Sequence, residues 1–394
     1  MQSEHSTASS TNVLIPLAVP NLAGNEEEYL RQCVVTNFVS SVGPYVGEFE
    51  SQLSLRVKSK HVVATNSGTS ALHLMLIYAG VKPGDLVIIP SYSFIATANA
   101  VSMTGAKPWF MDIELSSWGL DPNLLREELL SNCSRSNQGL VHRSSGSRVA
   151  AIMPVYAAGH PPRVADLCQV ADEFQIPIVF DSAAALGSKS DGREIGEIDA
   201  LHALSFNGNK TITCGGGGAV IVNDTEAAQF IKHISTTARS EDGYSHDAVG
   251  FNYRLTNVQA AIGVAQLENL EEFLAQKNRI AKTYQNAFSG LSGGNFPDVS
   301  TDTASHWLSG IILKDEHREY MTKIVQSLAD DGIQARESWR PLHEMPPYRN
   351  CLSSKMDAME FLRDRVLTLP NSTNLTIDDQ EKVINSLRRI LAHL

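Results

Sequence analysis

The 394-residue chain lacks the features that mark several specialised classes of protein. It has no excess of positive charge, and its net charge of −11 argues against nucleic acid or an anionic membrane as the main partner. No apolar run approaches the roughly 20 residues that span a bilayer. Residues 1–12 are polar and have no apolar core, so we expect a disordered tail there rather than a signal peptide.

Cysteine is scarce, and the five thiols are scattered and odd in number. None lies at metal-ligand spacing, and the twelve histidines include no H-E-x-x-H cluster, so we predict no catalytic metal. This use of cysteine predicts reduced thiols in the cytoplasm. A dinucleotide-binding loop is also missing, because the glycines at 215–218 lead into a strand pattern and not into a helix.

What the chain does have, between about residues 60 and 225, is an alternation of short apolar runs and helical patterns typical of parallel α/β proteins. Strands are expected at residues 86–89, 149–155, 176–180 and 219–222, and helices at 69–78 and 165–174. The polar stretch 130–148 predicts a surface loop. A long helix that begins near Thr256 and continues to Leu274 is expected to lead into a C-terminal domain.

Lys210 lies on a turn rich in Asn and Gly, where the backbone can approach a ligand closely. Asp181 ends one of the expected strands. A lysine that can form an imine and a buried acid that can hold a pyridinium proton are the two groups that pyridoxal phosphate chemistry needs most. Asp181 has an alternative interpretation as the N-cap of a helix formed by the alanines that follow it.

Three residues at the start of the expected 69–78 helix, Ser67, Gly68 and Thr69, suit a phosphate. Free backbone N–H groups and the positive end of the helix dipole lie there, although an ordinary helix cap has the same sequence. Ser205, five residues before Lys210, is placed to donate a hydrogen bond to the same phosphate.

Two further residues are candidates for the site. Phe94 follows an expected strand on the side where open α/β sheets bind ligands, so its ring can stack on a flat cofactor, the alternative being a core aromatic. The amide of Asn252 could reach a phosphate, the alternative being a structural loop.

In their order along the chain, these residues resemble the DegT/DnrJ/EryC1/StrS family of sugar aminotransferases. The resemblance extends from Ile15 to the C-terminus and includes residues 43–50, 250–261, 340–343 and 369–370. It implies the aspartate-aminotransferase-like α/β fold (fold type I). We therefore expect a large domain over residues 13–270 with a mostly parallel seven-stranded sheet, and a smaller α+β domain over residues 271–394.

The resemblance also assigns roles to the site residues. By position, Lys210 is the Schiff-base lysine and Asp181 the partner of the pyridine nitrogen of pyridoxal phosphate. Gly68, Thr69 and Ser205 match phosphate-binding positions, and Phe94 matches the ring-stacking position. Asn252 matches a residue that family members lend to the neighbouring subunit, which implies a homodimer with a shared active site.

Residues 15–26 and 205–210 look most like the branch that aminates C4 of nucleotide-linked 4-keto-6-deoxy sugars, with glutamate as amino donor. The expected substrate is a UDP-2-acetamido-4-keto-2,6-dideoxyhexose used for bacterial surface glycans. GDP-perosamine synthesis, amination at C3, a non-aminating pyridoxal phosphate enzyme and a regulatory homologue are the alternatives. Lys210 argues against a dehydratase, because family members with that activity carry His at this position.

The chain departs from the family pattern at three positions. Ala184 stands where many members have Gln or His, so the contact to the phenolic oxygen of the cofactor is unassigned. Tyr156 takes the place of a His, and Arg163 takes the place of an Asp. These departures concern the substrate more than the cofactor.

Overall fold

The computed structural model describes residues 15–240, 243, 245–294, 296–297 and 304–394. The tail expected at residues 1–12 lies outside these residues. Within them, no helix combines the length and the apolar character that crossing a membrane requires.

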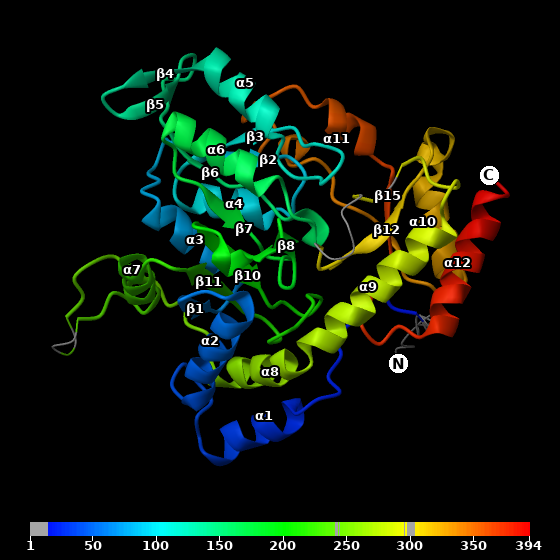
Figure 1. The fold of residues 1–394 in the computed structure, drawn as a ribbon, viewed down its shortest axis with the longest axis horizontal. Coiled ribbons are helices and arrows are strands. Elements are labelled where there is room, and N and C mark those ends of the chain that lie inside the picture. Colours follow the sequence, from blue (N-terminus) through cyan, green and yellow to red (C-terminus); the bar gives the residue numbers. More distant parts are fainter. Residues whose placement is uncertain (1–14, 241–242, 244, 295, 298–303) are drawn as a thin grey trace, which may run out of the picture.

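A mostly parallel sheet forms the centre of the molecule (Figure 1). Its strands, in spatial order, are β1 (His61–Thr65), β11 (Gly218–Val222), β10 (Leu201–Ser205), β7 (Val179–Asp181), β6 (Val149–Ile152), β2 (Leu86–Pro90) and β3 (Lys107–Met111). Parallel bridges from Ile152 to Ile178 and from Val155 to Asp181 join its two halves. Of these strands, β11 alone runs against the others. The predicted seven-stranded α/β architecture is therefore confirmed, and the two-residue β14 (Leu352–Ser353) extends its edge.

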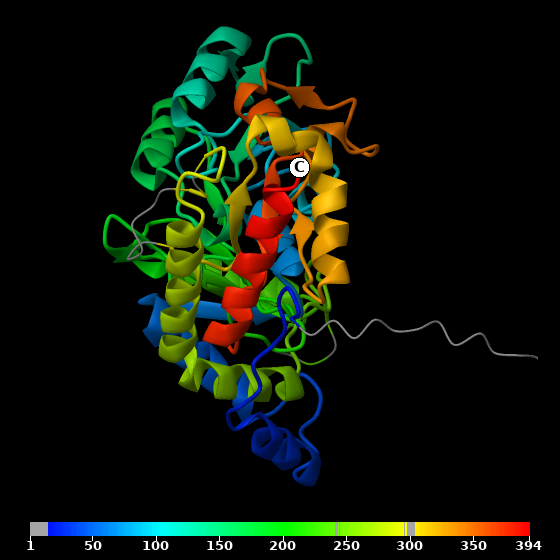
Figure 2. The same ribbon diagram turned by 90° about the vertical axis from the view of Figure 1, so that its right-hand side faces the viewer.

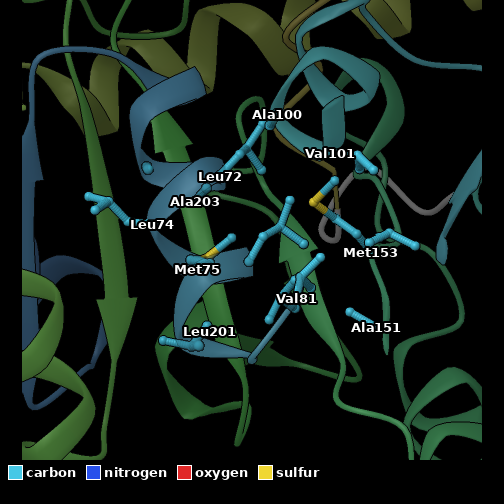
Figure 3. Close-up of a cluster of buried hydrophobic side chains, with 14 of the residues drawn as sticks. Leu72, Leu74, Met75, Val81, Ala100, Val101, Ala151, Met153, Leu201 and Ala203 are labelled. Carbon is cyan, nitrogen blue, oxygen red and sulfur yellow. The ribbon is translucent and has the colours of Figure 1, made fainter. Parts of the chain in front are cut away.

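Helices cover both faces of this sheet because its strands are apolar on both sides. Val87 and Ile89 of β2 point into one core, and the alternate residues Leu86 and Ile88 point into another. The first core is closed by α3 (Gly68–Tyr78), α4 (Ala96–Met103) and α7 (Thr225–Ser235), and Figure 3 shows its side chains from α3 facing those of the sheet. The other face is covered by α2 (Pro44–Val57), α5 (Pro122–Asn132), α6 (Val164–Phe174) and α8 (Asn257–Glu268). Helix α1 (Glu26–Val35) lies against α8.

A second, antiparallel sheet lies in the C-terminal part of the chain. It consists of β12 (Ser309–Ile312), β15 (Val366–Leu369) and β13 (Arg336–Glu337). Three helices pack near this sheet (Figures 1 and 2): α9 (Leu270–Ala287), α10 (Met321–Asp330) and α12 (Ile377–Leu391). Their apolar side chains and those of the sheet form one hydrophobic core. Shorter helices are α11 (Asp357–Leu362), η1 (Ala157–Gly159), η2 (Ile195–Glu197), η3 (Asp315–Tyr320) and η4 (Leu342–Glu344). The division of the chain at residue 270 stays a prediction.

Two sequence predictions differ from the structure. The stretch expected to be a loop, 130–148, contains the hairpin of β4 (Cys133–Ser136) and β5 (Gly139–His142), because Cys133 and Leu140 bury their side chains while the polar residues between them stay exposed. The long helix expected from Thr256 is two helices, since Asn269 leaves the helical conformation and its side-chain amide donates to Ala265 O (3.1 Å). A second small hairpin pairs β8 (Lys189–Ser190) with β9 (Arg193–Glu194).

Candidate active site

The candidate residues gather at one edge of the large sheet. Strands β1, β10, β7 and β2 run in the same direction. Ser205 and Asp181 are the last residues of β10 and β7, and Ser67 and Phe94 lie just beyond the carboxyl ends of β1 and β2. In open α/β sheets this is the edge at which ligands bind. The topology therefore brings together residues that are up to 138 positions apart (205 − 67).

Asp181 is buried at the end of β7, with a side chain held by two donors. Thr97 Oγ1 donates to its Oδ2 (2.6 Å), and the backbone N–H of Ala183 donates to its Oδ1 (3.1 Å). Burial raises the pKa of the carboxyl, while these hydrogen bonds and the charge of Lys210 oppose the rise. Asp181 is not the side-chain cap of an alanine helix, since residues 183–187 form turns.

Lys210 follows β10 on a turn closed by its own N–H, which donates to Asn207 O (3.0 Å). The residue as a whole is half-buried, but its amine points inward and lies 3.5 Å from the centroid of the Trp307 ring. Burial lowers the pKa of Lys210 to about 7, and the charge of Asp181 opposes the fall. An amine with this pKa is partly unprotonated near neutral pH, so it can act both as a nucleophile and as a base.

Helix α3 begins directly against Ser205. Ser67 caps the helix by accepting a hydrogen bond from the N–H of Ser70 (3.1 Å). A Cβ added to Gly68 would lie 2.8 Å from the Ser205 Cβ, and one added to Gly218 would lie 2.6 Å from Gly68 N. Glycine is therefore required at both positions for the hydroxyl of Ser205 to lie beside the N-terminal N–H groups of α3, an arrangement that suits a phosphate.

The remaining sequence candidates lie at the surface of this edge. Thr69 is half-buried in the first turn of α3. Phe94 is 58% exposed, which excludes the alternative of a core aromatic. Asn252 is exposed, and its backbone oxygen accepts a hydrogen bond from the Asn66 side chain (3.3 Å). Phe94 and Asn252 are thus open to a ligand or to another protein surface.

Sequence reasoning missed two side chains, Thr97 and Trp307, that contact Asp181 and Lys210 respectively. Thr97, whose hydroxyl donates to Asp181, lies four residues after Ser93, and the two hydroxyl oxygens are 2.6 Å apart. A Ser and a Thr at this spacing beside Phe94 were a usable signal. Trp307, which underlies Lys210, is 97 positions away in the sequence (307 − 210), and no local pattern marks it.

The three departures from the family pattern lie in different surroundings. Ala184 is buried, and its backbone oxygen accepts a hydrogen bond from Ser305 Oγ (2.7 Å). Tyr156 is buried against Phe180, with ring centroids 6.2 Å apart. Arg163 lies half-exposed at the start of α6, where it pairs with Asp166 (2.6 Å).

The side chains at this edge fit pyridoxal phosphate. A buried carboxylate can hold a protonated ring nitrogen, an amine with a lowered pKa can bond the aldehyde carbon, and the start of α3 with Ser205 can receive the phosphate. In the part of the chain that the structure describes, no group of three or more His, Cys, Asp or Glu is arranged to hold a metal ion.

Comparison with known proteins gives the same picture. The sequence profile of the DegT/DnrJ/EryC1/StrS aminotransferase family matches residues 20–388. The chain is 34% identical over 386 residues to the EpsN protein of Bacillus subtilis (strain 168), covering 96% of this chain and 95% of that protein. It is 33% identical over 380 residues to the GDP-perosamine synthase of Caulobacter vibrioides, covering 96% and 98%.

Solved structures agree over nearly the whole length. An aminotransferase of the same family from Brucella abortus superposes with a TM-score of 0.84 at 26% identity, covering 93% of this chain and 95% of that one. The structure of S. venezuelae DesV in complex with a ketimine intermediate superposes with a TM-score of 0.83 at 28% identity, covering 94% and 95%. The chain therefore belongs to the DegT/DnrJ/EryC1/StrS aminotransferase family, and it is a sugar aminotransferase that depends on pyridoxal phosphate.

Proposed function

We propose that this enzyme transfers the amino group of glutamate to C4 of a nucleotide-linked 4-keto-6-deoxy sugar, a UDP-2-acetamido-4-keto-2,6-dideoxyhexose. The observation that carries the amino-transfer chemistry is the buried amine of Lys210, which lies against the Trp307 ring and has a pKa lowered to about 7 despite the charge of Asp181. The product is an amino sugar for a bacterial surface glycan. Two sequence segments, residues 15–26 and 205–210, support the choice of C4.

Lys210 is the residue that binds the cofactor covalently and moves the proton. When bound, pyridoxal phosphate supplies an electron sink that stabilises negative charge on the carbon that loses a proton. With a pKa of about 7, the amine of Lys210 can take this proton and return it at the neighbouring carbon without a large energy difference between its two forms. The same amine serves both half-reactions, first with glutamate and then with the keto sugar.

Asp181 keeps the ring nitrogen of the cofactor protonated. Its carboxylate is held in one orientation by Thr97 and by the N–H of Ala183, and it is shielded from water. A fixed charge in a buried site interacts more strongly than one in water. Asp181 therefore sets the electron demand of the ring, and Thr97 sets the position of Asp181.

The remaining site residues bind and orient the cofactor in this proposal. Ser67, Gly68 and Thr69 at the start of α3 bind the phosphate together with Ser205, and the close approach between Gly68 and Ser205 supports this role. Phe94, whose ring is exposed beside Thr97, stacks on the cofactor.

We also propose that the enzyme works as a homodimer with a shared active site. Support comes from a run of apolar side chains that are exposed in the single chain, at the end of α1 and just after it: Val34, Val35, Phe38, Val39 and Val42. Exposed apolar side chains gathered in one stretch of the chain are typical of a protein interface. Asn252, also exposed, is then the residue that one subunit contributes to the phosphate site of the other.

A GDP-linked sugar is the second candidate substrate. It is favoured by one observation, the 33% identity over nearly the full length to a relative named GDP-perosamine synthase. The experiment that separates the candidates is incubation of the purified enzyme with glutamate and a panel of UDP- and GDP-linked 4-keto and 3-keto sugars. The proposal expects an amino sugar, identified by mass, from the UDP-linked 4-keto sugar. Amination of the GDP-linked sugar alone, or at C3 alone, would contradict it.

A further inference from the structure

A short segment that comes from outside the large sheet carries Trp307 to the amine of Lys210. The segment, residues 305–309, leads into β12 of the second sheet. The indole N–H of Trp307 donates to Asn209 O (2.7 Å), and the face of its ring lies 3.5 Å from Lys210 Nζ. One side chain therefore fixes the turn that carries Lys210 and also contacts its reactive atom.

Residues near the large sheet hold the beginning of the 305–309 segment. The N–H of Ser305 lies within hydrogen-bonding distance of Gly159 O (3.1 Å) and Ser188 Oγ (3.1 Å), and Ser305 Oγ donates to Ala184 O (2.7 Å). Gly159 has φ +90°, and a Cβ added there would lie 2.2 Å from Ser305 Oγ. A side chain at residue 159 would thus displace the segment, so glycine at this position permits the close approach.

A buried lysine with no role in the proposed reaction holds the other side of the segment. Lys277 of α9 is 2% exposed, and its Nζ donates to Trp307 O (3.2 Å) and to both oxygens of Asn371. In its ammonium form a lysine has three donors and no acceptor, and here three acceptors face Nζ. Asn371 in turn donates to His306 O (3.2 Å) and Ser309 Oγ (2.7 Å). Burying an ammonium is costly unless it is fully paired, and this one is paired to the segment that carries Trp307.

We propose that Trp307 is a platform that holds the amine of Lys210 whenever this amine is not bonded to the cofactor, and that Lys277 and Asn371 are positioning residues for the platform. The proposal rests on the proposed role of Lys210. In each half-reaction the lysine is released and must stay close to the carbon whose proton it moves. The negative face of an indole attracts a lysine ammonium without forming a bond that the next step must break.

The platform has an effect on ionisation that can be measured. Contact with the ring face favours the charged form of Lys210, so a residue that fills the space without an aromatic face should favour the neutral form. Asp181, at the end of β7, is the charged group that acts on Lys210 across the site. Two further titratable groups lie close to the ring on the described residues: His306, next to Trp307 in the chain, and Lys277, which donates to the backbone oxygen of Trp307.

The test compares the wild type with Trp307→Leu, Trp307→Phe and the matched control Trp339→Leu. Trp339 stacks on Trp307, with ring centroids 5.9 Å apart. Apoprotein is mixed with pyridoxal phosphate, and the rate of covalent loading is followed by visible absorbance from about pH 5 to about pH 10. The steady-state constants kcat and KM are measured with glutamate as a second readout.

Trp307→Leu should move the midpoint of loading about one pH unit lower, a tenfold change in the ionisation constant of Lys210. It should lower kcat more than it raises KM. Trp307→Phe keeps a ring face and should keep the midpoint, while Trp339→Leu should behave as the wild type. Lys277→Met, which leaves the ring but removes its anchor, should give part of the shift. If circular dichroism shows that Trp307→Leu does not fold, Trp307→Met takes its place.

An unchanged pH midpoint of cofactor loading in Trp307→Leu, or an equal shift in Trp339→Leu, would show that Trp307 does not hold the amine of Lys210. The proposed function is tested separately by Lys210→Ala. If this variant fails to load while Trp307→Leu loads as the wild type does, the platform is wrong and the role of Lys210 stands. If Lys210→Ala still makes amino sugar at the normal rate, the proposed function itself is wrong.

Discussion

The pKa of Lys210 is the quantity on which the proposed chemistry depends most, and it can be tested by changing pH and the charge of Asp181. Burial lowers this pKa from its ordinary value of 10.5 to about 7. At pH ~7.5 about three-quarters of the side chain is then the free amine, compared with about one in a thousand for an ordinary lysine. The structure therefore predicts several hundredfold more nucleophile near neutral pH than an exposed lysine provides.

The assay is the rate at which apoprotein loads pyridoxal phosphate, measured across pH in wild type and in Asp181→Asn. The wild-type rate should rise with a midpoint near pH 7. Because the charge of Asp181 raises the pKa of Lys210, its removal should move the midpoint to lower pH. A wild-type midpoint near the ordinary lysine value would show that the amine of Lys210 is not buried, and a shift to higher pH in Asp181→Asn would show that the charge of Asp181 does not raise its pKa.

Three further predictions concern the surroundings of the site. Because the pKa of Lys277 is lowered to about 7, the folded state binds fewer protons than the unfolded state from about pH 7 to about pH 10. As pH rises through this window, the free energy of unfolding of the wild type should therefore increase relative to that of Lys277→Met, which urea unfolding measures. The same pH dependence in both proteins would argue against a buried amine. Gly68→Ala places a Cβ 2.8 Å from that of Ser205, so it should destabilise the fold by about 1–3 kcal/mol and weaken cofactor binding. Thermal unfolding and cofactor titration measure the two effects. An unchanged affinity for the cofactor would show that the start of α3 does not bind its phosphate. Phe38→Asp, in the exposed apolar run, should convert a dimer to monomers in analytical ultracentrifugation and reduce activity, whereas an unchanged mass would show that the interface lies elsewhere.

The sequence predicts the large sheet, and the edge at which the candidate residues gather, because short apolar runs that alternate with helical patterns have few other solutions. Asp181 and Ser205 end strands and Phe94 follows one, so parallel pairing alone places them at one edge. Sequence patterns do not predict elements whose structure is determined by tertiary contacts. The hairpin within residues 130–148 is polar on its exposed positions, and only the burial of Cys133 and Leu140 makes it a structured element.

The surroundings of Lys210 were the least predictable part of the site. Its turn is visible in the sequence as Asn and Gly residues, but the low pKa depends on burial, and burial is completed from elsewhere in the chain. Trp307 lies in the segment that leads into β12 and Lys277 lies in α9, and neither is part of a local motif. Long-range packing of this kind leaves no periodic trace in a single sequence.

The central claim is that this enzyme moves the glutamate nitrogen to a nucleotide-linked keto sugar through Lys210. The most direct measurement uses glutamate with an isotopically labelled amino group, the UDP-linked 4-keto sugar, and mass spectrometry of the product from wild type and from Lys210→Ala. We expect labelled 4-amino sugar from the wild type and none above background from the variant. Product without the label, or labelled product from Lys210→Ala at the wild-type rate, would contradict it.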